Sequence, residues 1–191
     1  AIEDRKCRIE ALRKQSQAFL GKDWLVLEIG CGHGRFLIDA AKQNPKKHFV
    51  GIDLLNKRLK YCFEKKERNR LSNVDFLKAE AVELLEALPE GCLSEVVILF
   101  PDPWPKKRHA KNRLIQSEFL SLLLSRVNEE GRFYFRTDNV PYYEEAREKV
   151  ALHENWDLDT NSPWPMDKDT FFEEVAGKGF FQSFVAFKAG S

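Results

Sequence analysis

The segment "DWLVLEIGCGHGRF" (residues 23–36) joins a short apolar run to three closely spaced glycines and then to an amphipathic stretch. The apolar run predicts a buried strand, and residues 34–43 follow helical periodicity. Glycines between a strand and a helix allow backbone angles and close approaches that a Cβ atom would prevent, and the helix start offers free amides. The segment therefore predicts a strand–loop–helix unit that holds a ligand against its glycines.

The rest of the chain repeats this alternation of apolar runs and helical stretches. Further strands are predicted at 48–53, 74–80, 94–100 and 131–138, and further helices at about 55–70, 81–88, 114–127 and 141–151. Such alternation predicts an α/β fold of the Rossmann-like kind, with a mostly parallel, doubly wound sheet and helices on both faces.

Both ends of the chain depart from the alternation. Residues 1–20 predict a surface helix, and residues 156–179 predict a long substrate-side loop with a short helix near 170–176. The run "FFQSFVAFKAG" (180–190) predicts a last strand that pairs antiparallel at or near the sheet edge. We expect one domain over residues 1–191, because this length suits a single core.

Composition limits the classes of function. The chain has 43% hydrophobic and 32% charged residues with a net charge of +1, so any contact with nucleic acid must come from a local basic patch. The sequence predicts no membrane span and no signal peptide. Four irregularly spaced cysteines favour neither a zinc site nor disulfides, which predicts no metal and a reducing, cytoplasmic setting. A monomer and a homodimer are both compatible with the sequence.

The first group of candidate site residues lies at the predicted strand ends. Asp53 ends the second strand, 19 residues after Gly34, where an acid can accept hydrogen bonds from both hydroxyls of a ribose. The spacing GxGxG and the acid Glu28 favour the cationic amino acid end of S-adenosylmethionine over the pyrophosphate of a nicotinamide cofactor. Glu80, after the third strand, either lies near the adenine or caps the following helix. The predicted cofactor-binding residues are Glu28, Gly30, Gly32, Asp53, Glu80 and Asp102.

The second group follows the fourth strand in "FPDPWPKKRHAKNRL" (100–114). Its three prolines stiffen the backbone around Asp102, which we expect next to the transferred methyl group. Trp104 can stack on a base or anchor the loop by packing. A cationic run comes directly behind the acid and predicts contacts with RNA phosphates, through Lys107, Arg108, Lys111 and Arg113.

These motifs together resemble one family. "LEIGCGHG", "GID", "FPDPWPKKRH", "RTD" and "TFFE" occur in the order and approximate spacing of the bacterial tRNA (guanine-N7)-methyltransferases, over residues 24–190. The resemblance implies methylation of guanine 46 in the tRNA variable loop with S-adenosylmethionine as cofactor. It implies a catalytic role for Asp102, RNA contacts from residues 108–113, and substrate contacts from Lys106, Asp138, Thr170 and Glu173.

The chain departs from the family pattern at three places. Cys31 replaces an aromatic residue in the glycine loop, "TFFE" (170–173) lacks the usual base after Thr170, and "GKG" (177–179) replaces GHG. Asp138 could also cap the helix that follows it. Two other functions stay open: an N-methyltransferase for a different RNA, protein or small molecule, and an RNA-binding module without chemistry. The cationic run after Asp102 favours a polyanionic substrate, and transfer of methyl groups to tRNA would distinguish an enzyme from a binding module.

Overall fold

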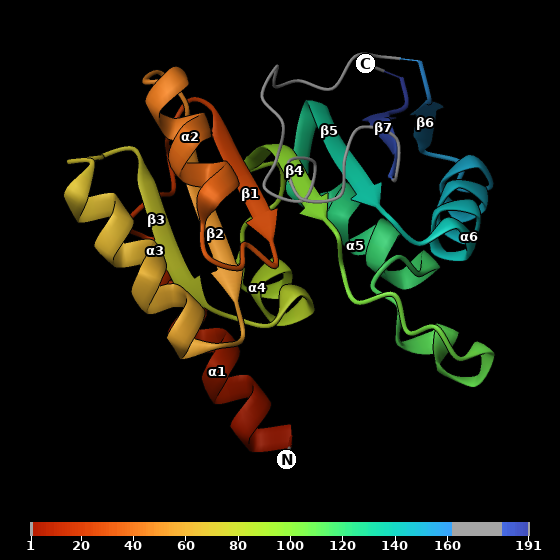
Figure 1. Cartoon of the computed structure of the whole chain (residues 1–191), viewed down its shortest axis with the longest axis horizontal. Helices are drawn as coiled ribbons and strands as arrows, with labels where there is room; N and C mark the ends of the chain where they lie inside the picture. The colour runs from red at the N-terminus through yellow and green to blue at the C-terminus, as the bar shows by residue number, and fades with distance from the viewer. Residues whose placement is uncertain (1, 162–180, 191) are drawn as a thin grey trace.

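The structure is a computed structural model that describes residues 2–161 and 181–190 (Figure 1). Its helices are α1 (Ile2–Ser16), α2 (Arg35–Gln43), α3 (Asn56–Arg68), α4 (Ala81–Ala87), the 3-10 helix η1 (Lys107–Asn112), α5 (Ser117–Arg126) and α6 (Val140–Ala151). Its strands are β1 (Leu25–Ile29), β2 (His48–Asp53), β3 (Val74–Lys78), β4 (Leu93–Leu99), β5 (Val127–Thr137), β6 (Trp156–Asp159) and β7 (Gln182–Lys188).

The strands form one seven-stranded sheet in the order β3-β2-β1-β4-β5-β7-β6. Strands β1 to β5 run parallel, and β7 runs antiparallel to both of its neighbours. The order reverses between β1 and β4, because the chain moves outward from β1 to β3 and then returns to the other side of β1. In such sheets ligands bind beyond the carboxyl ends of the strands at this reversal. The predicted α/β fold with a mostly parallel sheet is confirmed.

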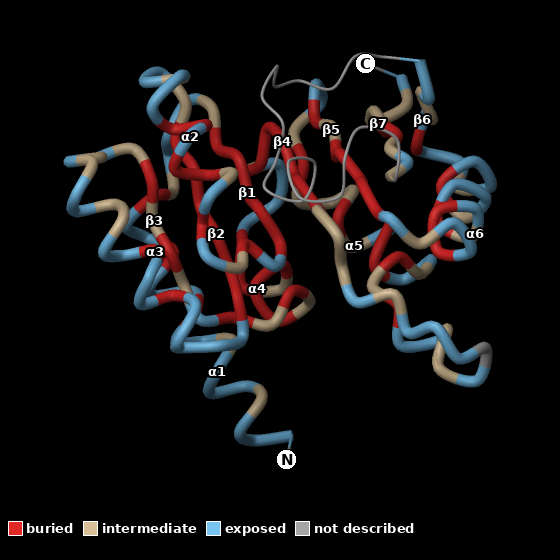
Figure 2. Tube along the Cα trace, viewed as in Figure 1, coloured by how far each residue is buried: buried red, intermediate tan, exposed pale blue. Residues whose placement is uncertain are grey.

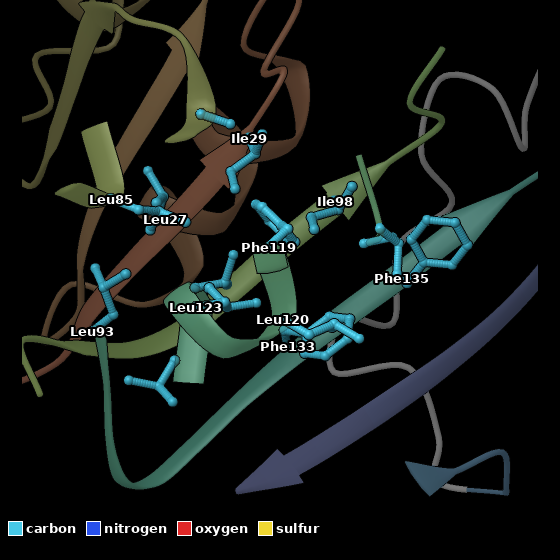
Figure 3. Packing of buried hydrophobic residues seen from close by; sticks show 14 of the residues in the cluster. Leu27, Ile29, Leu85, Leu93, Ile98, Phe119, Leu120, Leu123, Phe133 and Phe135 are labelled. Carbon is cyan, nitrogen blue, oxygen red and sulfur yellow. The ribbon is translucent and has the colours of Figure 1, made fainter. Parts of the chain in front are cut away.

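Alternate strand residues supply two separate cores, one on each face of the sheet. Leu27 and Ile29 of β1 pack in the core beneath α4, α5 and α6, whereas Val26 packs beneath α2 and α3. Figure 1 shows α2 and α3 together on one face, and Figure 2 shows the buried sheet between exposed helix surfaces. Figure 3 shows the larger core, in which strand side chains interdigitate with those of α5: Leu27, Ile98, Phe119, Leu120, Leu123, Phe133 and Phe135. Burial on both faces fixes the strand ends that form the site.

The C-terminal part of the sheet corrects one expectation. The prediction of a continuous loop over 156–179 is wrong at its start, because Trp156–Asp159 form strand β6 at the sheet edge. The Trp156 side chain fixes this strand: it is 3% exposed, and its Nε1 donates a hydrogen bond to the Leu120 carbonyl at 3.1 Å. The antiparallel C-terminal strand is confirmed as β7, which lies between β5 and β6. The short helix expected near 170–176 lies outside the described residues.

Candidate cofactor and substrate site

The glycine loop after β1 provides an open surface at the sheet reversal. Gly30 has a φ of 78°, in the left-handed region, and a Cβ atom placed there would meet nothing within 4 Å. Gly34 also has a positive φ, of 70°, but a Cβ atom there would lie 2.9 Å from the sulfur of Cys62. The two glycines therefore serve different purposes: Gly34 lets the loop pack onto α3, and Gly30 leaves room for a ligand above the loop.

Glu28 is a buried carboxylate beneath this loop. The residue is 3% exposed, and its Oε2 has no hydrogen-bond partner within the part of the chain that the structure describes. Burial, with smaller contributions from Cys62 and Asp53, raises the pKa of Glu28 well above its ordinary value. An unpaired acceptor in a buried site costs stability unless a donor reaches it. The position therefore suits a positively charged hydrogen-bond donor.

Asp53 at the end of β2 is held in place by three donors. The backbone N–H of Leu55 donates to its Oδ1 at 2.9 Å, and the backbone N–H of Gly32 donates to its Oδ2 at 3.1 Å. Arg58 of α3 donates to the same Oδ2 at 3.3 Å. Because a carboxylate has about four acceptor positions, Asp53 can accept one further hydrogen bond while these donors fix its orientation.

A cavity of about 480 Å³ opens beyond the carboxyl ends of β1, β2, β3 and β4. This volume lies within the range of small-molecule sites. Four residues predicted from the sequence line it, namely Gly30, Asp53, Glu80 and Asp102. Glu28 and Gly32 adjoin it through the glycine loop. Six predicted site residues are thus brought to one edge of the sheet.

Glu80 caps the helix that follows it and also lies at the cavity. Its Oε2 accepts a hydrogen bond from the backbone N–H of Glu83 at 2.9 Å, so its side chain caps α4. The same residue lines the cavity. Capping fixes the position of this carboxylate at the cavity wall.

The segment after β4 has a strained backbone. Phe100 has a φ of 47° and Trp104 a φ of 44°, conformations that cost a residue with a side chain about 1–2 kcal/mol each. Phe100 is held by its N–H, which donates to the Arg136 carbonyl of β5 at 2.8 Å. Both residues and Asp102 line the cavity. Strain of this kind persists where the surrounding structure demands it, and here it brings an acid and an indole ring to the cavity.

The cationic run divides into outward and inward residues. Lys106, Arg108 and Lys111 are exposed, and Lys107 belongs to η1. Arg113 is 7% exposed, donates through Nε to the Pro103 carbonyl at 2.9 Å, and forms an ion pair with Glu145 of α6. The expectation that Arg113 contacts RNA does not fit this burial. Figure 2 shows the segment before α5 projecting from the sheet with a mostly exposed surface.

Two of the predicted substrate residues, Lys106 and Asp138, do not line the cavity. Asp138 follows β5 and is exposed. It does not cap α6, because the side chain of Asn139 accepts the hydrogen bond from the backbone N–H of Tyr142 at 2.9 Å. Thr170 and Glu173 lie outside the described residues.

The cavity also contains residues that the sequence reasoning missed. Leu54 and Leu55 line it directly after Asp53, although they are 59% and 51% exposed. Two apolar residues placed directly after an acid at a strand end are a signal that could have indicated an apolar part of the cavity wall. Arg58 and Asn112 also line the cavity, but nothing in their local sequence distinguishes them from other polar residues.

Across residues 2–161 and 181–190, no group of His, Cys, Asp and Glu side chains is arranged to hold a metal ion. In the same ranges no helix is long and apolar enough to cross a bilayer.

Known proteins with similar sequences are methyltransferases. The family model described as "Putative methyltransferase" matches residues 22–178. A tRNA (guanine-N(7)-)-methyltransferase of Halalkalibacterium halodurans is 35% identical over 81% of this chain and 72% of its own length. A bifunctional glycosyltransferase/methyltransferase of Fusobacterium nucleatum is 36% identical over 78% of this chain and 23% of its own length.

Solved structures support the fold. The aminoglycoside resistance methyltransferase NpmB1 superposes with a TM-score of 0.67 at 17% identity, covering 93% of both chains.

The match covers only part of each of several curated relatives: it spans 23%, 58% and 59% of the length of three of them. The resemblance seen in the motifs is confirmed, and the chain belongs to the putative methyltransferase family, alongside relatives named tRNA (guanine-N(7)-)-methyltransferase.

Proposed function

We propose that this chain transfers a methyl group from S-adenosylmethionine to N7 of guanine in tRNA, with guanine 46 of the variable loop as the target. The observation that carries the proposal is that Asp102, from the most specific motif of the chain, lines the same cavity as the glycine loop and Asp53. Relatives named tRNA (guanine-N(7)-)-methyltransferase support the choice of tRNA and of guanine N7. A cytoplasmic location belongs to the same proposal, because all four cysteines are free thiols.

The residues of the cavity fit S-adenosylmethionine. The unpaired Oε2 of Glu28, which adjoins the cavity through the glycine loop, suits its ammonium group. Asp53, already fixed by the amides of Gly32 and Leu55, suits a ribose hydroxyl. Leu54 and Leu55 offer an apolar surface for the adenine ring, and Glu80 lies at the wall beside them. When bound, this cofactor supplies an electrophilic methyl group on a sulfonium.

The proposed reaction requires alignment more than proton removal. Guanine N7 carries a free lone pair, so the N7–methyl bond forms as the sulfur–methyl bond breaks, and no base is needed to activate it. Positive charge moves from the sulfur to the guanine ring. Asp102, at the cavity wall, would accept hydrogen bonds from the N–H groups of the guanine and would stabilise the positive charge that develops on the ring. Asp138 at the neighbouring strand end would contact the substrate from outside the cavity.

The exposed cations would bind the phosphates around the target base. Lys106, Arg108 and Lys111 are exposed on the segment that leaves the cavity at Asp102. Phosphate neutralisation releases counterions and makes affinity fall steeply with salt, whereas it contributes little to the choice of base. Lys107 of η1 belongs to the same proposed surface, and we leave Arg113 out of it because it is buried.

The first experiment separates chemistry from binding at Asp102. We expect Asp102→Ala and Asp102→Asn to lower the single-turnover rate of tRNA methylation by about 100-fold or more while changing the tRNA dissociation constant by less than about threefold. Equal losses in rate and binding would contradict a catalytic role. A wild-type protein that binds tRNA and S-adenosylmethionine but transfers no methyl group would support the RNA-binding module instead.

The second experiment tests the exposed cations against a matched control. Arg108→Ala/Lys111→Ala removes two positive charges beside the cavity, and Lys22→Ala/Lys46→Ala removes two exposed charges before β1 and β2, at the opposite edge of the sheet. We expect the first pair to weaken tRNA binding and to reduce the slope of log affinity against log salt by about 1–2. The control pair should leave the slope unchanged. Equal slopes for both pairs would mean that the cationic run is an ordinary solvated loop that does not bind phosphates.

A further inference from the structure

Arg113 occupies the centre of a buried contact network rather than the protein surface. Its side chain is 6% exposed and touches three groups at once. Its Nε donates to the Pro103 carbonyl at 2.9 Å, its Nη1 donates to Glu145, and its guanidinium carbon lies 5.0 Å from the centre of the Tyr142 ring. These groups belong to two segments, the loop after β4 and helix α6, so one side chain links them.

The α6 side of the network is itself fixed. Lys149 donates to Glu145 at 2.5 Å and to the Gln116 side chain at 2.6 Å, which joins α6 to the residue before α5. The hydroxyl of Tyr142, a fully buried residue, accepts a hydrogen bond from the backbone N–H of Ile115 at 3.3 Å. Arg113 is therefore held between a fixed helix and the fixed start of α5.

The loop side of the network reaches the strained part of the site. The Pro103 carbonyl belongs to the peptide group that precedes Trp104, and the orientation of this peptide is what the φ of Trp104, 44°, describes. Pro103 has no N–H, so the carbonyl is its one polar backbone group. A hydrogen bond from a fixed guanidinium selects one orientation of the peptide between Pro103 and Trp104. Asp102 is the residue directly before Pro103. The contact thus reaches two residues that line the cavity, Asp102 and Trp104.

We infer that Arg113 and Glu145 form a positioning pair that holds the loop carrying Asp102 and Trp104 against α6, and that Arg113 does not contact RNA. The inference rests on the proposed function for the role of Asp102. The electrostatics agree, because Glu145 lies against Arg113 and would repel a phosphate there. Arg108 and Lys111, five and two residues earlier, are exposed and differ from Arg113 in this respect.

The test compares Arg113→Ala, Arg113→Lys and Glu145→Gln with Arg108→Ala as the matched control. We expect the first and third to lower the single-turnover methylation rate at saturating tRNA and S-adenosylmethionine by about 10- to 100-fold. Hydrogen exchange of amides in residues 100–113 should accelerate in both, while the salt slope of tRNA binding stays unchanged. Arg113→Lys should recover only part of the rate, because an ammonium cannot bridge Pro103 and Glu145 as a planar guanidinium does. Arg108→Ala should show a different pattern, with a lower salt slope of tRNA binding and no faster amide exchange in residues 100–113.

Glu145→Gln is the decisive variant, because it leaves Arg113 in place even if Arg113→Ala fails to fold. A positioning pair predicts a loss of rate, and Arg113→Ala/Glu145→Gln should then be no worse than the more damaging single variant. If Arg113 were a phosphate contact, removing the competing carboxylate would tighten tRNA binding and Arg113→Ala would lower the salt slope by about 1. Those results would overturn the inference. A wild-type protein that methylates no guanine would overturn the proposed function instead, and the exchange of residues 100–113 would still test the positioning pair.

Discussion

Glu28→Gln should make the free protein more stable and should weaken its binding of S-adenosylmethionine. The carboxylate is 3% exposed, one of its oxygens has no partner among the described residues, and burial raises its pKa. Because the folded-state pKa lies above the unfolded value, the contribution of Glu28 to stability is complete below about pH 4 and is lost as the pH rises through the folded-state pKa. At neutral pH the wild-type protein therefore carries a destabilising group that the glutamine variant lacks.

The size of the effect follows from the burial of one polar group. An unsatisfied buried polar atom costs about 1–3 kcal/mol, and the glutamine amide keeps part of that cost, so we expect the variant to gain about 1 kcal/mol. For a chain of this length that gain raises Tm by about 2–4 °C. Loss of a charge-assisted hydrogen bond of about 1.5–3 kcal/mol should weaken S-adenosylmethionine binding by about 10- to 150-fold. Ligand at 100 times the wild-type Kd would then stabilise the variant by about 1.4 kcal/mol or less, compared with about 2.7 kcal/mol for the wild type.

The assay is thermal unfolding of both proteins at pH 7.5 and near pH 4, with and without S-adenosylhomocysteine. At pH 7.5 the free variant should be more stable than the wild type, and the ligand should stabilise it less. Near pH 4 the difference between the free proteins should shrink, because Glu28 is then largely protonated in both states. A variant that is less stable when free and keeps the full ligand-induced shift would refute the reasoning.

Three further predictions concern stability. Gly34→Ala should cost about 1–3 kcal/mol in urea unfolding, because its φ is 70° and the added Cβ would lie 2.9 Å from the Cys62 sulfur; wild-type stability would contradict this packing. Phe133→Ala should cost about 3–5 kcal/mol, since Phe133 is fully buried against Trp156 and Phe184, and a loss below about 1 kcal/mol would contradict that burial. Burial alone would raise the pKa of Glu145, but the hydrogen bonds from Lys149 and Arg113 outweigh it and lower this pKa. Glu145 should therefore stabilise the folded protein above about pH 4.3, and this contribution should be lost as the pH falls through the folded-state pKa. Unfolding of wild type and Glu145→Gln between pH 5 and pH 3 checks this, and a difference that does not narrow in acid would disprove it.

The parallel part of the fold could be predicted because its signals are local. Strands β1 and β2 are buried on both faces, so their sequences are mostly apolar; glycine follows β1, and an acid ends β2. Strand β6 could not be predicted in this way. It is four residues long with one buried residue, Trp156, and it pairs with β7, which begins 26 residues later at Gln182. Such pairing depends on the folded sheet rather than on a periodic pattern.

The candidate site shows the same division. Gly30, Asp53 and Asp102 could be placed together because each lies at the end of a parallel strand or within three residues after it, and those ends share one edge. Arg113 could not be separated from the other cations of its run by sequence alone. Its partner Glu145 lies 32 residues away on α6, and only the folded chain brings the two together. One residue of this cationic run, Arg113, is therefore buried, and its role depends on an acid that is distant in the sequence.

Transfer of a labelled methyl group to guanine N7 of tRNA tests the central claim most directly. The wild-type protein is incubated with unmodified tRNA and S-adenosylmethionine labelled in the methyl group, and the product is then cleaved at 7-methylguanine. The account predicts label in tRNA and one cleavage site at guanine 46, with both signals reduced about 100-fold or more in Asp102→Ala. Label at a different atom or base, or no label in a protein that binds both ligands, would contradict it.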